Sequence, residues 1–439
     1  MDVKMGQEGD PLRVFMLGWE FPPFISGGLG TACYGLTKAM DQLGMRVTFV
    51  LPKLVATQYA THVNLLTPGS RLGPPYSHRE FKNVKFYAVP SGLLPYSTPR
   101  GYSRRIEDVL RQKAGARGVA HLIAQPTLDA MHYGNDLYAE VHRYAAVAAE
   151  LALAEEFDVI HAHDWMTFPA GIAVAAVTGR PLIAHVHSTE FDRSGEHVNQ
   201  MIYDIERTGM ERADRIIAVS SLTRNVIMSR YGIPGHKVEV VYNAVERNGG
   251  WSLASAGIRR DEKIVLFLGR ITMQKGPEYF LRAAKKVLEV MEDVKFVMAG
   301  SGDLMHRAIS LAAELGIGHK VLFTGFLRGD EVRQIYQMAD LYVMPSVSEP
   351  FGIAPLEALE HDVPVIISKQ SGVSEVLNHA LKVDFWDVHE IANKIVAVLR
   401  YPALQMTLRD HGSFEVRKLR WRDSARKCAR IYDEMLRPT

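Results

Sequence analysis

Cysteine is scarce in this sequence, which has only Cys33 and Cys428 among its 439 residues. The two lie near opposite ends of the chain and form no C-x-x-C pair, so neither a disulfide framework nor a zinc ribbon is expected. No apolar run approaches the roughly 18 residues of a membrane-spanning helix, and the polar segment Met1–Pro11 does not resemble a signal peptide. These absences predict a cytoplasmic protein without a transmembrane segment.

An excess of charge of one sign is also missing. Lys and Arg number 51 and Asp and Glu 49, for a formal net charge of +2, so we expect no nucleic-acid partner. The basic segment 100–117 has only a short apolar face, so peripheral membrane contact is not favoured. The chain has no Asp-x-Asp motif, and enzymes that bind a nucleotide diphosphate through a metal ion need clustered carboxylates. We therefore expect no metal ion.

Short β-branched runs alternate with longer helical patterns, which is typical of doubly wound parallel sheets buried on both faces. Strands are predicted at 14–17, 47–51, 84–89, 159–161, 182–185, 216–219, 238–241, 264–268, 296–299, 321–324, 341–344 and 365–367. The turn-rich stretch 248–252 is the predicted linker. We therefore expect Rossmann-like domains at 1–247 and 253–415, an insertion at about 59–144 and a final helical segment, 416–439.

Two cations follow the first predicted strand of the second domain, in the pattern Gly269-Arg270-x(4)-Lys275-Gly276. Ligands of open α/β sheets bind beyond the carboxyl ends of the strands. Arg can grip a diphosphate with two parallel hydrogen bonds, and Lys adds a point charge. A solvated pair of loop charges is the alternative. Position at the sheet edge favours a diphosphate site.

Two carboxylates, Glu349 and Glu357, lie eight positions apart after the predicted strand 341–344. Glu349 falls in the loop, and Glu357 falls in the next predicted helix, whose N-terminus near Gly352 offers backbone N–H groups. Two unrelated surface acids would give the same pattern. The location at the same sheet edge as the cations favours a shared site.

A glycine-rich turn, with Gly27, Gly28 and Gly30, lies between the first predicted strand and the following helix. Glycine lets backbone approach a ligand, and the helix N-terminus favours an anion. A dinucleotide fingerprint is disfavoured because Cys33 stands where a third Gly or Ala is needed. The alternative interpretation, a tight turn that binds no ligand, is equally compatible with these residues.

Histidines follow two strands of the first domain, at His161, His163, His185 and His187. Residues two apart on a strand share a face, so zinc must be considered. For these histidines, contact with a sugar is the first interpretation and a hydrogen-bonded structural role is the second. A metal site comes last, because the sequence offers neither a Cys ligand beside them nor a helical His-Glu-x-x-His motif.

Together these motifs resemble the retaining glycosyltransferases of family four, which have the GT-B fold. The segment 27–39 and His161-Ala-His-Asp-Trp165 are also similar to glycogen and starch synthases, although Ile25 stands where those synthases usually carry a Lys. The resemblance implies an α/β architecture of two Rossmann-like doubly wound parallel-sheet domains facing across a cleft. It also implies a final helix that returns to the first domain.

The resemblance implies a role for each motif. Arg270 and Lys275 would hold the donor diphosphate and stabilise the leaving group, Glu357 would bind the ribose, and Glu349 would hold the donor sugar. The remaining donor contacts of the second domain would come from the backbone of Phe351, Gly352 and Ile353.

In the first domain, His163 would contact the sugar near its anomeric carbon. Gly27, Gly28 and Gly30 would close on the phosphates, and Glu190 and Asp192 would face the acceptor.

The expected function is transfer of glucose or a related hexose, with retention, from a nucleoside-diphosphate sugar such as ADP-glucose or UDP-glucose to an α-glucan or other glycan. No cofactor beyond that donor is expected. One alternative keeps the fold and donor but uses a lipid, a small sugar or a cell-surface polysaccharide as acceptor. Another, from a different class, is a non-catalytic nucleotide-sugar-binding subunit.

Overall fold

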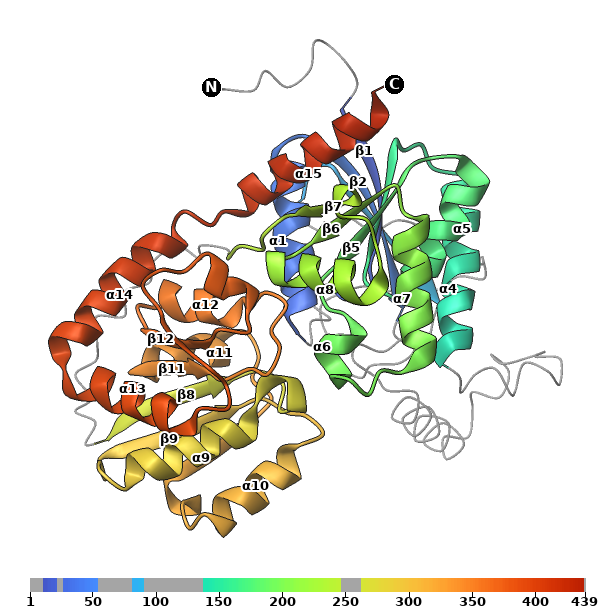
Figure 1. Ribbon diagram of the computed structural model, residues 1–439. Coiled ribbons are helices and arrows are strands. Elements are labelled where there is room, and N and C mark those ends of the chain that lie inside the picture. Colours follow the sequence, from blue (N-terminus) through green and yellow to red (C-terminus); the bar gives the residue numbers. More distant parts are fainter. Residues whose placement is uncertain (1–10, 22–26, 54–80, 91–136, 246–261, 438–439) are drawn as a thin grey trace, which may run out of the picture. The chain divides into compact units, whose positions relative to one another are not determined.

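The computed structural model describes residues 11–21, 27–53, 81–90, 137–245 and 262–437. Contacts between residues divide the chain into two compact units (Figure 1). Unit 1 contains Met1–Val186, Asp204–Ile217 and Ala425–Thr439, and unit 2 contains His187–Tyr203 and Ala218–Ser424. The predicted linker, the basic segment 100–117 and most of the predicted insertion lie outside the described residues.

The first sheet has seven strands in the order β3-β2-β1-β4-β5-β6-β7. Its strands are β1 (Arg13–Leu17), β2 (Arg46–Lys53), β3 (Val84–Pro90), β4 (Val159–His163), β5 (Leu182–Val186), β6 (Arg215–Ala218) and β7 (Val238–Val240). Strand β1 pairs in parallel with both β2 and β4. Every residue of β4 and β5 is buried, as expected for parallel strands covered on both faces.

Helices accompany this sheet, and several of them begin or end at local sequence signals. They are α1 (Gly28–Gln42), α4 (Leu137–Ala152), α5 (Phe168–Thr178), α6 (Glu190–Ser194), α7 (Gln200–Arg212) and α8 (Ser221–Tyr231), followed by the 3-10 turn η1 (Gly235–Lys237). Helix α8, for example, begins after Ser220, whose side chain accepts a hydrogen bond from the backbone of Thr223, and ends at the left-handed Gly232.

The second sheet has six strands in the order β10-β9-β8-β11-β12-β13. Its strands are β8 (Lys263–Leu268), β9 (Val294–Ala299), β10 (Val321–Gly325), β11 (Leu341–Met344), β12 (Val365–Ser368) and β13 (Leu381–Val383). Strand β8 pairs in parallel with β9 and β11. Each predicted strand range is occupied by a strand, and β13 is an additional short one.

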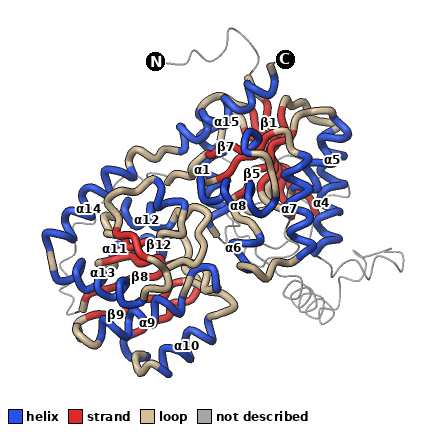
Figure 2. Tube along the Cα trace, in the orientation of Figure 1, coloured by secondary structure: helices blue, strands red, loops and turns tan. Residues whose placement is uncertain are grey.

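Helices surround this sheet (Figure 2), and aliphatic and aromatic side chains form the core between them. They are α9 (Pro277–Leu288), α10 (Met305–Glu314), α11 (Asp330–Met338), α12 (Ala354–Glu360), α13 (Val388–Arg400) and α14 (Pro402–Val416), with 3-10 turns η2 (Met273–Lys275), η3 (Gly318–Lys320) and η4 (Gly372–Glu375). Helix α9 starts at Pro277 with Glu278 in its first turn and ends with Lys285 and Lys286, which suits the helix dipole.

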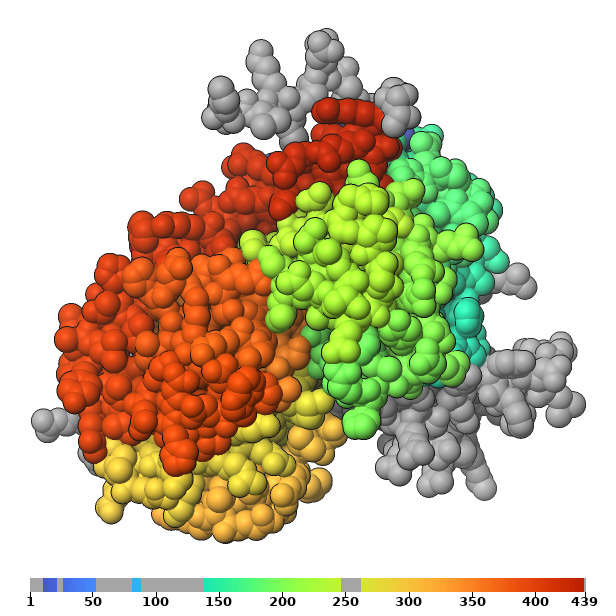
Figure 3. All heavy atoms as spheres, in the orientation of Figure 1, coloured from blue at the N-terminus to red at the C-terminus, as the bar shows by residue number. Residues whose placement is uncertain are grey.

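Helix α15 (Trp421–Leu436) occupies the range of the predicted final helix. Its residues from Ala425 onward group with unit 1 (Figures 1 and 3). Its inward face is fully or almost fully buried at Ala425, Cys428, Ile431 and Tyr432. In the part of the chain that is described, no helix has both the length and the apolar character needed to cross a membrane.

Candidate active site

The strand order of unit 2 places two loops beside one another at the carboxyl edge of its sheet. The chain runs from β8 outward to β9 and β10, and then returns to the other side of β8 with β11. Arg270 and Lys275 follow β8, and Glu349 follows β11. The two loops therefore flank the point where the strand order reverses, which is where open α/β sheets bind ligands.

Gln274 supports Arg270 and joins the two loops. The Arg270 Nη2 atom donates to the Gln274 Oε1 atom at 3.0 Å. The backbone carbonyl of the same Gln274 accepts a hydrogen bond from the backbone N–H of Val347 at 2.9 Å. Gln274 is only 3% exposed, so a polar residue of the β8 loop is fixed against the β11 loop.

Lys275 and Glu349 form an ion pair between the loops. The Lys275 Nζ atom donates to the Glu349 Oε2 atom, which also accepts a hydrogen bond from the Ser346 hydroxyl at 3.3 Å. Glu349 is nearly buried, whereas the Lys275 side chain keeps 21% of its surface exposed. An ammonium group has three donors, so Lys275 can hold Glu349 and still bind an incoming phosphate oxygen.

Two glycines determine the backbone path of these loops. Gly276 has φ +68°, and a Cβ atom there would lie 2.1 Å from the Pro345 carbonyl oxygen. Gly352 has φ +104°, and a Cβ atom there would lie 3.2 Å from the Glu349 Cγ atom. Both values of φ belong to the region that glycine occupies most readily. A side chain at either position would displace the loop that carries Lys275 or Glu349.

Glu357 lies in the first turn of α12, close to the same edge. Its Oε2 atom accepts a hydrogen bond from the Tyr336 hydroxyl at 3.1 Å. Burial raises the pKa of Glu357, while the bond from Tyr336 and the charge of His361 oppose that rise. The backbone of Phe351 donates no bond to these acids, but its carbonyl accepts from the Val373 N–H at 2.7 Å, which ties the β11 loop to η4.

The predicted residues of unit 1 also flank a reversal of strand order, between β1 and β4. His163 ends β4, and Gly28 begins α1 in the connection that follows β1. The Gly27 N–H donates to the Glu20 Oε1 atom at 2.7 Å. A Cβ atom on Gly28 would meet nothing within 4 Å, whereas Gly30 is buried inside the first turn of α1.

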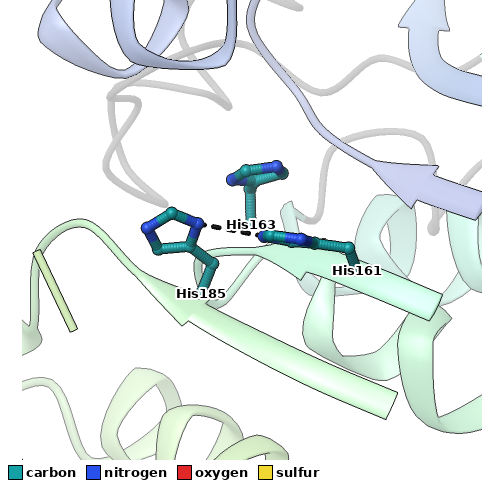
Figure 4. A group of neighbouring side chains, drawn as sticks. All are labelled: His161, His163 and His185. Carbon is teal, nitrogen blue, oxygen red and sulfur yellow. Dashed lines mark hydrogen bonds between the residues drawn. The ribbon is translucent and has the colours of Figure 1, made fainter. Parts of the chain in front are cut away.

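Three histidines gather at the ends of β4 and β5 (Figure 4). His161 Nε2 and His185 Nδ1 are hydrogen-bonded at 3.0 Å. The ring of His163 stacks on that of His161, with centroids 4.5 Å apart and planes 20° apart. It also lies nearly parallel to the ring of Phe49, with centroids 6.4 Å apart and planes 8° apart. Burial lowers the pKa of His163 to about 3, so this ring is neutral at physiological pH.

By distance alone, the same three histidines could hold a metal ion. Their candidate ligand atoms all lie within 4.8 Å of one another. A metal ion lies in the plane of each imidazole that binds it, and one ion cannot lie in two stacked, nearly parallel planes. His161 is also hydrogen-bonded at both nitrogens, to His185 and to Tyr432. This geometry fits a hydrogen-bonded stack of rings better than a set of metal ligands.

The two predicted acceptor-side acids lie in α6 and are both buried. Asp192 accepts bonds from the Thr189 N–H and hydroxyl, at 2.7 and 2.8 Å, and from the Ser348 hydroxyl. Glu190 accepts a bond from Arg193 Nε at 3.1 Å, among others. These carboxylates shape α6 and its neighbours, and their contact with an acceptor stays a prediction.

Sequence reasoning missed several supporting residues: Gln274, Tyr336, Ser346 and Tyr432. Gln274 and Ser346 could have been suspected, because each lies within three positions of a predicted catalytic residue. Nothing in the local sequence connects Tyr432 with His161, since the two are 271 positions apart.

Comparison with known proteins agrees with this architecture. A family model described as Glycosyltransferase Family 4 matches residues 26–248, and one described as Glycosyl transferases group 1 matches residues 252–412. An uncharacterized glycosyltransferase of Methanocaldococcus jannaschii is 31% identical, covering 84% of this chain and 83% of that protein. A glycogen synthase of Mycobacterium tuberculosis is 24% identical, covering 89% and 87%.

Solved structures resemble the fold at low sequence identity. Sucrose-phosphate synthase of Thermosynechococcus elongatus has a TM-score of 0.71 and 18% identity, covering 97% of this chain and 99% of that one. The Anabaena protein HepE in complex with UDP-glucose has a TM-score of 0.68 and 17% identity, covering 96% and 100%.

Two parallel Rossmann-like sheets give the chain a GT-B fold, and the two family models make it a glycosyltransferase. The matches place it more narrowly: the chain belongs to Glycosyltransferase Family 4. The predicted resemblance and fold class are confirmed, as is the assignment as a hexosyltransferase enzyme.

Proposed function

We propose that this protein transfers glucose or a related hexose, with retention, from a nucleoside-diphosphate sugar to an α-glucan or other glycan. One observation carries the proposal: Arg270 and Lys275 lie in a single loop at the strand reversal of unit 2, beside a nearly buried Glu349. That combination offers positive charge for a diphosphate and a fixed acceptor for sugar hydroxyls.

The proposed chemistry follows from the charge that develops. When the bond from the anomeric carbon to the diphosphate breaks, the leaving group becomes more negative and the sugar gains oxocarbenium character. Fixed cations aimed at that growing charge lower the barrier, because only interactions that strengthen in the transition state accelerate the reaction. Arg270 and Lys275 take this role, and no metal ion is needed for it.

Glu349 serves the donor sugar in this proposal. Its Oε2 atom is held by Lys275 and Ser346, so the carboxylate is fixed before the donor arrives. Preorganised acceptors of this kind require little rearrangement during the reaction. Glu357, oriented by the Tyr336 hydroxyl, binds the ribose.

Retention is proposed to proceed by attack on the face from which the diphosphate departs. Retaining hydrolases use two carboxyl groups about 5–5.5 Å apart, one of them as nucleophile. Glu349 and Glu357 are instead engaged with Lys275 and Tyr336. We therefore assign deprotonation of the acceptor to the departing phosphate. Incubation with donor alone should trap no glycosyl-enzyme, and a covalent adduct in intact mass spectra would contradict this route.

Relatives support two classes of acceptor. The glycogen synthase of M. tuberculosis favours a glucan. A D-inositol 3-phosphate glycosyltransferase of Catenulispora acidiphila, 28% identical over 65% of this chain and 74% of that protein, favours a small phosphorylated acceptor as the second candidate. HepE, solved with UDP-glucose, supports a nucleotide sugar as donor. A cytoplasmic location is proposed as well, consistent with free, buried Cys33 and Cys428.

A donor screen tests the proposal. Release of nucleoside diphosphate would be measured for ADP-, UDP- and GDP-sugars, with glycogen, maltose or inositol 3-phosphate as acceptor. Release that depends on glycogen supports the glucan acceptor, and release that depends on inositol phosphate supports the second candidate. Turnover should persist in EDTA. No release with any pair would favour a non-catalytic nucleotide-sugar-binding subunit.

A further inference from the structure

The histidine stack of unit 1 is anchored by a residue that is far away in the sequence. Tyr432, on α15, is fully buried. Its hydroxyl oxygen lies 2.5 Å from the Nδ1 atom of His161. The aromatic rings of the two residues are almost perpendicular, with an interplanar angle of 83°, so the phenol meets the edge of the imidazole where its nitrogen lies.

The hydroxyl proton of Tyr432 determines which nitrogen of His161 carries hydrogen. Burial raises the pKa of Tyr432 well above its ordinary value, so the group stays protonated at neutral pH. A phenol can donate or accept a hydrogen bond, and a neutral imidazole has one donor and one acceptor. The Tyr432 hydroxyl also has Cys428 as a hydrogen-bonding neighbour, and we assign Tyr432 as the donor to Nδ1 of His161. The Nε2–H of His161 then donates to Nδ1 of His185 across the 3.0 Å contact.

A ring held at both nitrogens has a fixed plane as well as a fixed tautomer. His161 is in that position, and His163 stacks against it at 4.5 Å. The ring of Phe49 is almost parallel to that of His163, with centroids 6.4 Å apart. Because Phe49, His161 and His163 are all fully buried, a tilt of His161 would be passed directly to His163.

We propose that Tyr432 is a positioning residue for His163, acting through the tautomer and plane of His161. The proposal rests on the proposed function in one respect: His163 is taken to contact the donor sugar. Tyr432 itself touches the imidazole and not the substrate. Helix α15 thus has a role in catalysis in addition to its packing in unit 1.

The first test is Tyr432→Phe, which keeps the ring and removes one hydroxyl. We expect kcat to fall about three- to tenfold, the usual range for one lost hydrogen bond, while the KM for the donor changes less than twofold. A fall in kcat with little change in KM indicates an interaction that is made mainly in the transition state. Tyr87→Phe is the matched control, because it also removes a hydroxyl hydrogen bond of unit 1, to Glu155 at 2.8 Å. Its kcat should stay within twofold of the unaltered enzyme.

The second test reads the tautomer directly and does not depend on activity. In protein with ¹⁵N-labelled histidine, the His161 signals should report hydrogen on Nε2, with His161→Gln providing the assignment. In Tyr432→Phe that tautomer should change or become mixed. An unchanged tautomer, or an unchanged kcat in a folded Tyr432→Phe, overturns the proposal.

The two proposals fail separately. If the unaltered protein shows no turnover with any donor, the proposed function fails, while the ¹⁵N spectra still decide whether Tyr432 controls His161. If turnover is normal and the spectra do not respond, only the role of Tyr432 fails. Thermal unfolding of Tyr432→Phe and Tyr87→Phe sets a common temperature, below both transitions, for all rate measurements.

Discussion

The carboxyl edges of the two sheets differ in their charge and in the exposure of their side chains. The edge of unit 2 holds charges that stay partly accessible, above all the Lys275–Glu349 pair. The edge of unit 1 holds the rings of His161 and His163, which are fully buried, and burial keeps His163 neutral by lowering its pKa to about 3. A charge that is shared with a ligand has to keep some exposure, whereas His161, which is proposed to act only through its neighbour His163, can be buried completely. Substitutions in unit 2 should therefore act on the donor, and those in unit 1 on orientation and pH response.

Lys275→Ala should have the largest effect, because it removes a cation aimed at the leaving group. We expect kcat to fall by on the order of 10²–10³, as for loss of one preorganised donor, in assays of released nucleoside diphosphate. Lys263→Ala is the control: this exposed lysine starts β8 and pairs with Asp340 at 3.2 Å, and its loss should leave turnover within twofold. A folded Lys275→Ala enzyme within tenfold of normal activity would remove the electrostatic role assigned to unit 2.

Gly276→Ala should come next, as a loss of stability of unit 2. A left-handed residue costs about 1–2 kcal/mol when it gains a Cβ atom, and the 2.1 Å approach to the Pro345 oxygen adds strain of about 1–3 kcal/mol. Gly316→Ala separates the two contributions, because Gly316 has a similar φ of +71° with nothing within 4 Å of its added Cβ atom. Urea unfolding should show the larger loss at Gly276. Equal losses would mean that the two loops are not held tightly together.

The pH response of stability should reveal the buried ring of unit 1. The pKa of His163 is lowered to about 3 by burial, against about 6.5 for an unfolded chain. Between these values the unfolded state binds the extra proton, so stability is present above pH 6.5 and is lost as pH falls toward 3. This group should lower the free energy of unfolding by about 2 kcal/mol at pH 5 relative to pH 7.

His163→Phe should remove that part of the pH dependence in urea titrations at pH 5 and 7. His389→Phe alters an exposed histidine of α13 and should retain the full difference. If His163→Phe retains it too, His163 takes up a proton in the folded protein and the unit 1 edge is not electrostatically neutral.

Glu357→Gln should have the smallest effect. The substitution keeps the shape and the bond from Tyr336 but weakens acceptance of the ribose hydroxyls. We expect about a tenfold rise in the donor KM with little change in kcat, since a hydrogen bond to a charged group contributes about 1.5–3 kcal/mol. Glu360→Gln, one turn later in α12, should leave KM unaltered. A fall in kcat without a rise in KM would assign Glu357 to the chemical step.

Much of the fold could be predicted from the sequence, because buried parallel strands appear as nearly continuous β-branched runs. The approach of Lys275 to Glu349 could also be anticipated, since both follow strand ends at one sheet edge. Strand β13 was missed because its three residues, Leu381–Val383, include only one β-branched side chain.

Contacts between distant segments could not be predicted in this way. Tyr432 meets His161 only because α15 returns to unit 1. The structural role of Asp192 could have been predicted from the sequence, since Thr189-x-x-Asp192 is a capping pattern. Its hydrogen bond with Ser348 could not, because Ser348 is 156 positions away in the chain.

The return of α15 also constrains how the protein is made on the ribosome. Tyr432 is synthesised 271 positions after its partner His161, a delay of roughly 15–50 s at translation speeds of about 5–20 residues per second. During that interval unit 1 lacks α15, so the apolar surface that this helix buries is open to chaperones. Nascent chains stalled before residue 425 should therefore be protease-sensitive even in segments long since translated.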